Sequence, residues 1–189
     1  MCSHSKWYFF NNMQRIHDQQ FDVFLPSDKI KERIREIAHK INEDYKDKNP
    51  LFLSILNGAF IFTADIFREI TIPAEVSFIK LKSYRRMETT GKVKELLGLE
   101  HNIYDRNIVI VEDIVDTGKT LQHILEEFKE LGTKSIEILT LLYKPEANKI
   151  PLDLKYIGFE IPNEFVVGYG LDYDGYGRNL KDIYKVVSQ

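Results

Sequence analysis

The chain has 189 residues, of which 26 are lysine or arginine and 29 are aspartate or glutamate, so its formal net charge is −3. This length suits one domain with a real hydrophobic core, and the acidic balance argues against a general nucleic-acid-binding protein. The single cysteine, Cys2, excludes an intrachain disulfide and a thiolate zinc site. Because no apolar run approaches the ~20 residues of a membrane span and no signal peptide is evident, we expect a cytoplasmic protein without a membrane partner.

The first half of the chain predicts short strands around a helix and then a strand–helix–strand unit. The apolar runs 7–10 and 21–24 are expected to be edge strands or a hood over a sheet. Helical periodicity extends from Ser27 to Asp47, with Ser27 or Asp28 as the N-cap. The elements that follow are a buried strand at 51–56, a helix from Phe60 to Glu69 and a strand at 75–82.

The second half alternates strand and helix after a long polar segment. Residues 83–104 form an unusually long connection, which indicates a mobile loop over a site or a solvated hairpin. The later elements are a strand at 108–111, a loop at 112–118, a helix from Lys119 to Leu131 that ends at Gly132, and strands at 135–143, 155–159, 165–170 and 183–187. This order predicts an α/β fold with a mainly parallel, twisted sheet flanked by helices.

Two adjacent acids, Glu112 and Asp113, follow the apolar strand at the sheet edge where α/β proteins bind ligands. Adjacent carboxylates are costly to bury unless a divalent cation or the hydroxyls of a ribose pair with them; otherwise they are solvated acids at a strand end. The segment 116–120, DTGKT, then places hydroxyl groups and a glycine where a helix begins, and the free N–H groups of a helix N-terminus favour an anion. The pattern predicts a site for a sugar phosphate.

The sequence Gly-Lys-Thr also ends the P-loop of nucleotide triphosphatases. That motif needs a glycine five positions before Gly118, where this chain has Asp113. Since the acids inside the loop would repel a triphosphate, the P-loop interpretation fails.

The stretch 109–120, VIVEDIVDTGKT, resembles the phosphoribosyl-pyrophosphate-binding motif of type I phosphoribosyltransferases. The tripeptides at 82–84 (KSY) and 142–144 (LYK), with the segment 157–172, narrow the resemblance to the hypoxanthine-guanine phosphoribosyltransferases. It covers about residues 50–187. It implies one phosphoribosyltransferase domain over 1–189, with a small hood from about 1–25 and 155–180 and a mobile loop at about 83–104.

The resemblance also implies roles for individual residues. Phosphoribosyl pyrophosphate and its 5′-phosphate would be bound by Glu112, Asp113, Asp116, Thr117, Gly118, Lys119 and Thr120. Pyrophosphate would be bound by Asn57, Gly58 and Arg178, the mobile loop would begin with Ser83 and Tyr84, and the purine would be bound by Lys144, Phe165, Val166 and Asp172. Mg²⁺ would be held by Glu112, Asp113 and Asp172, and Asp116 would be the catalytic general base.

Several of these residues have plainer alternatives. Without the resemblance, Lys144 and Arg178 would be taken as surface cations and Phe165 as a core aromatic. Asn57 departs from the basic residue that many relatives have, so its role is expected to rest on backbone N–H groups, including a cis peptide.

The implied activity is purine salvage: transfer of the phosphoribosyl group to hypoxanthine and guanine, giving IMP or GMP and pyrophosphate. The resemblance further implies a homo-oligomer, a dimer or a tetramer. The alternative is a regulator of the same fold that senses phosphoribosyl pyrophosphate and binds nucleic acid. The sequence favours the enzyme, because it shows no basic face or DNA-binding domain.

Overall fold

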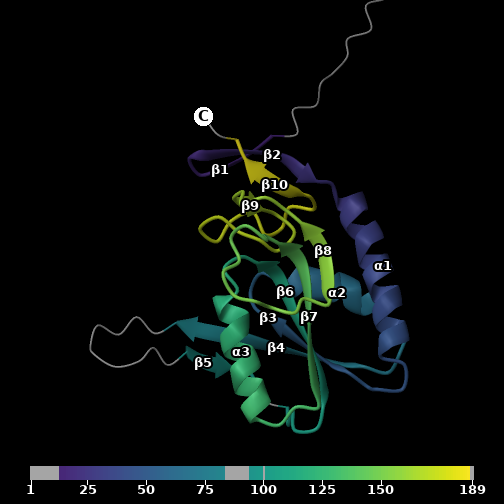
Figure 1. Ribbon diagram of the computed structural model, residues 1–189. Helices are drawn as coiled ribbons and strands as arrows, with labels where there is room; N and C mark the ends of the chain where they lie inside the picture. Colours follow the sequence, from purple (N-terminus) through teal and green to yellow (C-terminus); the bar gives the residue numbers. More distant parts are fainter. Residues whose placement is uncertain (1–12, 84–93, 100, 188–189) are drawn as a thin grey trace, which may run out of the picture.

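The computed structural model of the protein describes residues 13–83, 94–99 and 101–187. Its larger sheet has six strands in the order β5-β4-β3-β6-β7-β8, and all pairs except β4 with β5 are parallel (Figure 1). The strands are β3 (Leu51–Ile55), β4 (Glu75–Ser83), β5 (Lys94–Leu97), β6 (Asn107–Val115), β7 (Ser135–Tyr143) and β8 (Tyr156–Glu160). The predicted α/β class with a mainly parallel sheet is confirmed.

Helices cover both faces of this sheet. The helices α1 (Ser27–Asp44) and α2 (Phe60–Arg68) pack on one face, and α3 (Lys119–Glu130) packs on the other (Figure 1). Side chains alternate along β3, so that Phe52 packs with α1 and α2 while Leu51 and Leu53 pack with α3. Burial on both faces explains why β3 and β6 are nearly continuous apolar runs.

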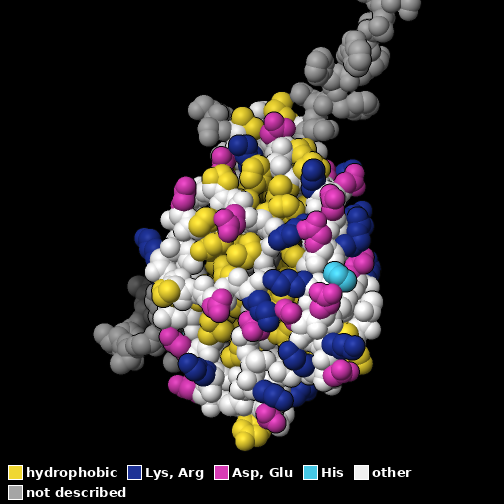
Figure 2. Space-filling model, turned by 45° about the vertical axis from the view of Figure 1, so that its right-hand side comes forward, with side chains coloured by type: hydrophobic (Ala, Val, Ile, Leu, Met, Phe, Trp, Pro, Cys, Tyr) yellow, Lys and Arg dark blue, Asp and Glu magenta, His cyan; other side chains and the backbone are white. Residues whose placement is uncertain are grey.

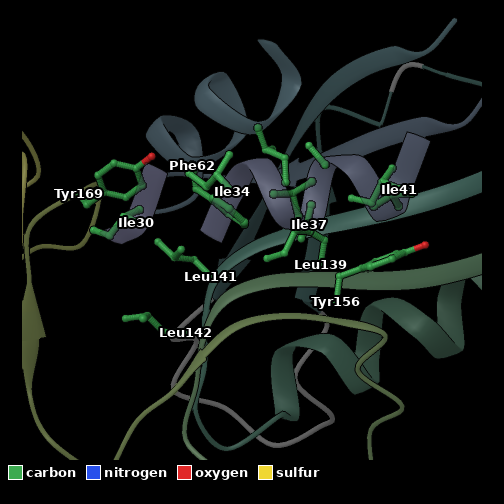
Figure 3. Packing of buried hydrophobic residues seen from close by; sticks show 14 of the residues in the cluster. Ile30, Ile34, Ile37, Ile41, Phe62, Leu139, Leu141, Leu142, Tyr156 and Tyr169 are labelled. Carbon is green, nitrogen blue, oxygen red and sulfur yellow. The ribbon is translucent and has the colours of Figure 1, made fainter. Parts of the chain in front are cut away.

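The α1 side of the core is built from residues at helical spacing. Isoleucines of α1 point toward Leu139, Leu141 and Tyr156 of the sheet, as Figure 3 shows for Ile30, Ile34, Ile37 and Ile41. Phe62 of α2 fills the space beside them and is fully buried. Among the described residues, no helix combines the length and the apolar character that crossing a membrane requires.

A second, antiparallel sheet lies over the carboxyl ends of the large one. Its order is β1-β2-β10-β9, with β1 (Gln14–Ile16), β2 (Gln19–Leu25), β9 (Val166–Val167) and β10 (Ile183–Val186). We call this sheet the hood; it contains the predicted run 21–24, while the run 7–10 lies outside the described residues. The boundary expected for the hood, 155–180, differs from the observed one, because β8 pairs with β7 in the large sheet and β10 joins the hood.

The predicted cap of the first helix was wrong. Pro26 occupies the N-cap, and neither Ser27 nor Asp28 caps the helix through its side chain. Instead the backbone N–H of Ser27 donates to the Asp182 carboxylate at 2.7 Å. The helix N-terminus is therefore satisfied by an acid that lies 155 residues further along the chain.

Two further boundaries differ from expectation. The strand β6 does not end at 111: its parallel pairing with β7 continues through Glu112, Ile114 and Val115, so the two acids lie within the strand rather than in a loop. The predicted connection 83–104 contains β5, which pairs with β4 in the antiparallel sense, as the hairpin alternative predicts. Residues 84–93 and 100 of that loop lie outside the described part of the chain, so its role as a mobile cover stays a prediction.

Replacing Phe62 by alanine tests the core. Because the ring is fully buried, its removal leaves a cavity between α2 and the sheet, and the free energy of unfolding should fall by about 3–5 kcal/mol. Urea unfolding followed by circular dichroism measures this. Phe60→Ala, on the same helix but 41% exposed, is the matched control and should lower the free energy by less than half as much. Equal losses would contradict this packing.

Candidate active site

The site lies where the parallel strands β3, β6 and β7 end side by side. The turn Leu56–Gly58 follows β3, the acid pair lies in the last part of β6, and Lys144 follows β7. The peptide bond between Leu56 and Asn57 is cis. Since neighbouring parallel strands end at the same edge, segments far apart in the sequence meet at one place.

The acid pair lies in a largely enclosed position. Glu112 has a carboxylate oxygen, Oε2, that is buried and has no hydrogen-bond partner among the described residues. Burial, with a smaller effect from the neighbouring Asp113, raises the pKa of Glu112 well above its usual value. Burial also raises the pKa of Asp113 to about 6, although the N–H of Ile114 and the charge of Arg178 lower it. The pair therefore has unused capacity to accept hydrogen bonds or to bind a cation.

Gly58 is where the acid pair meets the turn after β3. A Cβ atom on this residue would lie 1.5 Å from Oδ2 of Asp113, so no larger residue fits while that carboxylate is in place. Gly58 also packs closely against Gly170. A Cβ atom on Gly170 would lie 2.1 Å from the carbonyl oxygen of Gly58. The neighbouring Asn57 is exposed, and its carbonyl accepts from the N–H of Phe60 at 3.4 Å.

The segment 116–120 forms the N-terminus of α3. Gly118 is the N-cap with a φ of +79°, and no side chain caps the helix. A Cβ on Gly118 would lie 2.7 Å from Oδ1 of Asn148, so glycine is required for space as well as for its backbone conformation. Thr117 and Lys119 are exposed and Thr120 is half-buried. An uncapped helix N-terminus with hydroxyl groups beside it can bind an anion.

Lys144 is brought to the same place from β7. Its side chain is buried, its Nζ lies 3.7 Å from Oδ2 of Asp116, and its backbone N–H donates to the carbonyl of Val115 at 2.9 Å. Asp116 is half exposed, so this carboxylate faces the open side of the site. Two residues that are 28 positions apart in the sequence thus place a cation and an anion together.

The connection between the hood strands β9 and β10 supplies two more of the predicted residues. Asp172 pairs with Arg178 at 2.6 Å, and its other carboxylate oxygen accepts the N–H of Gly175. Both charges act on the pKa of Asp113, Arg178 lowering it and Asp172 raising it. The charged residues of the hood and the end of β6 therefore share one site.

The aromatic candidate, Phe165, lies directly before β9. Its ring is 46% exposed and contacts Tyr173 edge-on with 5.6 Å between centroids. Val166 is buried within the strand. An aromatic ring left this exposed beside polar groups can stack on a planar ligand.

For two predicted residues the structure does not describe the position of the side chain. Tyr84 lies outside the described residues, and Ser83 is described only as the last residue of β4.

Some residues that shape the site were missed in the sequence. Asn148 packs on Gly118, and its amide donates to the hydroxyl of Tyr143 at 3.2 Å. Gly170 packs on Gly58. The only local signal was the pair of glycines around Tyr169, since Asn148 lies in an otherwise ordinary loop.

Figure 2 shows hydrophobic side chains gathered in the middle of the drawn face and charged ones around them.

Asp113→Asn should stabilise the free protein at neutral pH. Because the folded-state pKa is raised from 3.8 to about 6, the folded state holds the proton more tightly than the unfolded chain does. The contribution of this carboxyl group to the free energy of unfolding therefore falls as the pH rises through this range and is constant above it. The variant should gain about 1–2 kcal/mol at pH 7, less than the full shift because solvent reaches part of the side chain.

Unfolding by urea across this pH range measures the difference between Asp113→Asn and the unaltered protein. Asp105→Asn, which changes an exposed carboxylate, is the control and should show no such dependence. An unaltered protein that is as stable as the Asp113 variant at pH 7 would contradict the burial of this charge.

Comparison with known proteins identifies the family of the chain. The model of the phosphoribosyl transferase domain matches residues 22–174. The chain is 42% identical over 168 residues to a hypoxanthine phosphoribosyltransferase of Buchnera aphidicola subsp. Schizaphis graminum, covering 87% of this chain and 95% of that protein. It is 41% identical over 169 residues to the hypoxanthine phosphoribosyltransferase of Escherichia coli, covering 88% and 95%.

A solved structure shows the same fold. The crystal structure of a hypoxanthine-guanine phosphoribosyltransferase from Bacillus anthracis has a TM-score of 0.81 to this structure at 38% identity, covering 88% of this chain and 98% of that one. Since the family model spans most of the chain and these relatives match it nearly end to end, the chain belongs to the phosphoribosyltransferase family.

Proposed function

We propose that this protein is a purine-salvage enzyme that transfers the 5-phosphoribosyl group from phosphoribosyl pyrophosphate to hypoxanthine or guanine. The products are IMP or GMP and pyrophosphate. The observation that carries the proposal is the position of Lys144, 3.7 Å from Asp116 at the start of the DTGKT segment. This contact joins a group suited to a purine to a site suited to a sugar phosphate. The names of the relatives support the same activity.

The sugar phosphate would occupy the end of β6 and the start of α3. The ribose hydroxyls would donate to Glu112 and Asp113, and so satisfy the buried oxygen that lacks a partner. The 5′-phosphate would accept N–H groups from Thr117, Gly118, Lys119 and Thr120 at the uncapped helix N-terminus.

The base would lie between Lys144 and the hood. The Lys144 ammonium group would donate to the 6-oxo group of the purine, Phe165 would stack on the ring, and Val166 would offer backbone groups to the ring edge. The amino group that adenine has in place of the oxygen is a donor, and it would face another donor. A buried site with that mismatch discriminates strongly.

Asp116 would act on the base while the new bond forms. A ring nitrogen of the purine attacks C1′, the bond from C1′ to the pyrophosphate oxygen breaks, and the purine releases a proton. Asp116 is half exposed and lies beside Lys144, so it can accept that proton as a general base. The pyrophosphate would leave toward Asn57, Gly58 and Arg178, whose guanidinium group suits a phosphate.

The carboxylates of the site fit Mg²⁺. They offer the hard oxygen ligands that this ion prefers, and Glu112 has a free buried oxygen. Since Mg²⁺ is usually bound through one or two carboxylates together with substrate oxygens, the ion would be held by one or two of Glu112, Asp113 and Asp172 with oxygens of the substrate. When bound, Mg²⁺ neutralises charge on the leaving pyrophosphate.

We also propose a single catalytic domain that assembles as a dimer or tetramer in the cytoplasm. Family membership supports this, and light scattering tests the assembly. The regulator that binds nucleic acid is not favoured, since the relatives reported above are named as transferases.

Substrate choice is the most direct test. With Mg²⁺ and phosphoribosyl pyrophosphate, hypoxanthine and guanine should give nucleotide, and adenine should react at least about 10³-fold more slowly in kcat/KM because its amino group lacks an acceptor. Product formation is followed by the change in ultraviolet absorbance. If neither 6-oxopurine gives nucleotide, the proposed function is wrong.

Asp116→Asn tests the general base. Asparagine keeps the shape of the side chain but cannot accept the proton, so kcat should fall by about 10²-fold. Affinity for phosphoribosyl pyrophosphate, measured by calorimetry, should change much less. Asp105→Asn serves again as the control. Equal losses in kcat and in affinity would argue for a binding role instead.

A further inference from the structure

A hydrogen bond joins the connection between β9 and β10 to helix α2, away from the residues that the proposed reaction uses. The hydroxyl of Tyr169 donates to Oδ2 of Asp65 at 2.6 Å, across 104 residues of sequence. Tyr169 is only 4% exposed, and burial followed by Asp65 raises the pKa of its phenol. The phenol therefore stays protonated and donates to the carboxylate.

The backbone around Tyr169 has an unusual shape. Gly168, Tyr169 and Gly170 all have positive φ, at 99°, 51° and 103°. A non-glycine residue rarely adopts this conformation, and it persists where surrounding contacts hold it. The Tyr169 side chain is held in this conformation by its packing in the core cluster and by its hydrogen bond to Asp65.

On the α2 side, Asp65 belongs to the same continuous unit as the turn after β3. The N–H of Phe60 donates to Asn57, and that of Thr63 donates to Ala59, so the helix starts directly from Gly58. On the hood side, Gly170 follows Tyr169 and packs on the Gly58 carbonyl. The segment 168–170 therefore contacts α2 and the turn before it at two points. One is the hydrogen bond between Tyr169 and Asp65, and the other is the backbone contact between Gly170 and Gly58.

The hood unit extends to the charged residues of the site. The N–H of Gly170 donates to the carbonyl of Arg178 at 2.9 Å, and the guanidinium group of Arg178 donates to the carbonyl of Gly170 at 2.6 Å. Arg178 in turn pairs with Asp172. Whatever fixes Tyr169 also fixes Arg178 and Asp172 relative to Gly58.

We propose that Asp65 is a positioning residue for the pyrophosphate end of the site, acting through Tyr169. This inference rests on the proposed function, because it concerns where that reaction's pyrophosphate group binds. Without the bond, the Tyr169 ring keeps its packing in the core cluster that includes Phe62, but the segment 168–171 loses its hydrogen bond to α2, and Arg178 shifts relative to Gly58. The base side is less affected, because Lys144 directly follows β7 in the large sheet and Phe165 is held separately, its carbonyl accepting the N–H of Val186.

Four variants test this. Asp65→Ala and Tyr169→Phe each remove the hydrogen bond. Asp65→Asn keeps an oxygen that can accept from the phenol, so it is the conservative rescue. Arg68→Ala is the matched control, since it removes the exposed ion pair of Asp65 with Arg68 and leaves the bond to Tyr169. Each is assayed forward and in reverse from IMP and pyrophosphate, with thermal unfolding measured alongside.

In Asp65→Ala and Tyr169→Phe, the KM for phosphoribosyl pyrophosphate and for pyrophosphate should rise about tenfold, because small misplacements of binding groups are costly. The KM for hypoxanthine should rise less than about twofold. Asp65→Asn and Arg68→Ala should stay near the unaltered protein. A double variant of Asp65 and Tyr169 should be no worse than either single one, since both remove one interaction.

A lower melting temperature with unchanged KM values would show a structural role and overturn the proposal, as would equal rises in KM for both substrates. An unaltered protein that makes no nucleotide would contradict the proposed function and this inference together. An active unaltered protein whose variants bind pyrophosphate normally would contradict this inference alone.

Discussion

The site depends on the pairing of β6 with parallel neighbours on both sides. Because β3 and β7 run in the same direction as β6, their carboxyl ends meet at one edge. Helices bury both faces of these strands, so the backbone at that edge is held rigidly. The turn of Gly58, the acids of β6 and the lysine after β7 owe their proximity to this arrangement.

That rigidity lets the protein keep an electrostatically unfavourable group. Two adjacent carboxylates are buried where neither is fully paired, and burial raises both pKa values. A fold of marginal stability retains such a pair only where a ligand compensates for it. The acid pair can thus bind hydroxyl groups and a cation, and the Asp113 carboxylate packs closely against Gly58.

Features with a local basis could be predicted from the sequence. The class of the fold follows from the alternation of apolar runs with segments of helical periodicity. The motif 109–120 is contiguous, so the residues that predict its chemistry stand together in the sequence. The exact end of β6 was missed, because only the pairing with β7 extends the strand past Val111. The contacts of Ser27 with Asp182 and of Tyr169 with Asp65 leave no local pattern, since they join residues 155 and 104 positions apart.

The hood has a consequence for the order in which the chain folds during synthesis. Strand β2 pairs with β10, and the start of α1 is completed by Asp182, so the N-terminal part of the hood has only the pairing of β1 with β2 until the last strand has been made. At ordinary translation rates, 155 residues take on the order of ten seconds or longer. Through that interval Phe21, which is fully buried in the finished hood, stays exposed on the nascent chain. The hood is therefore the last part of the fold to be completed.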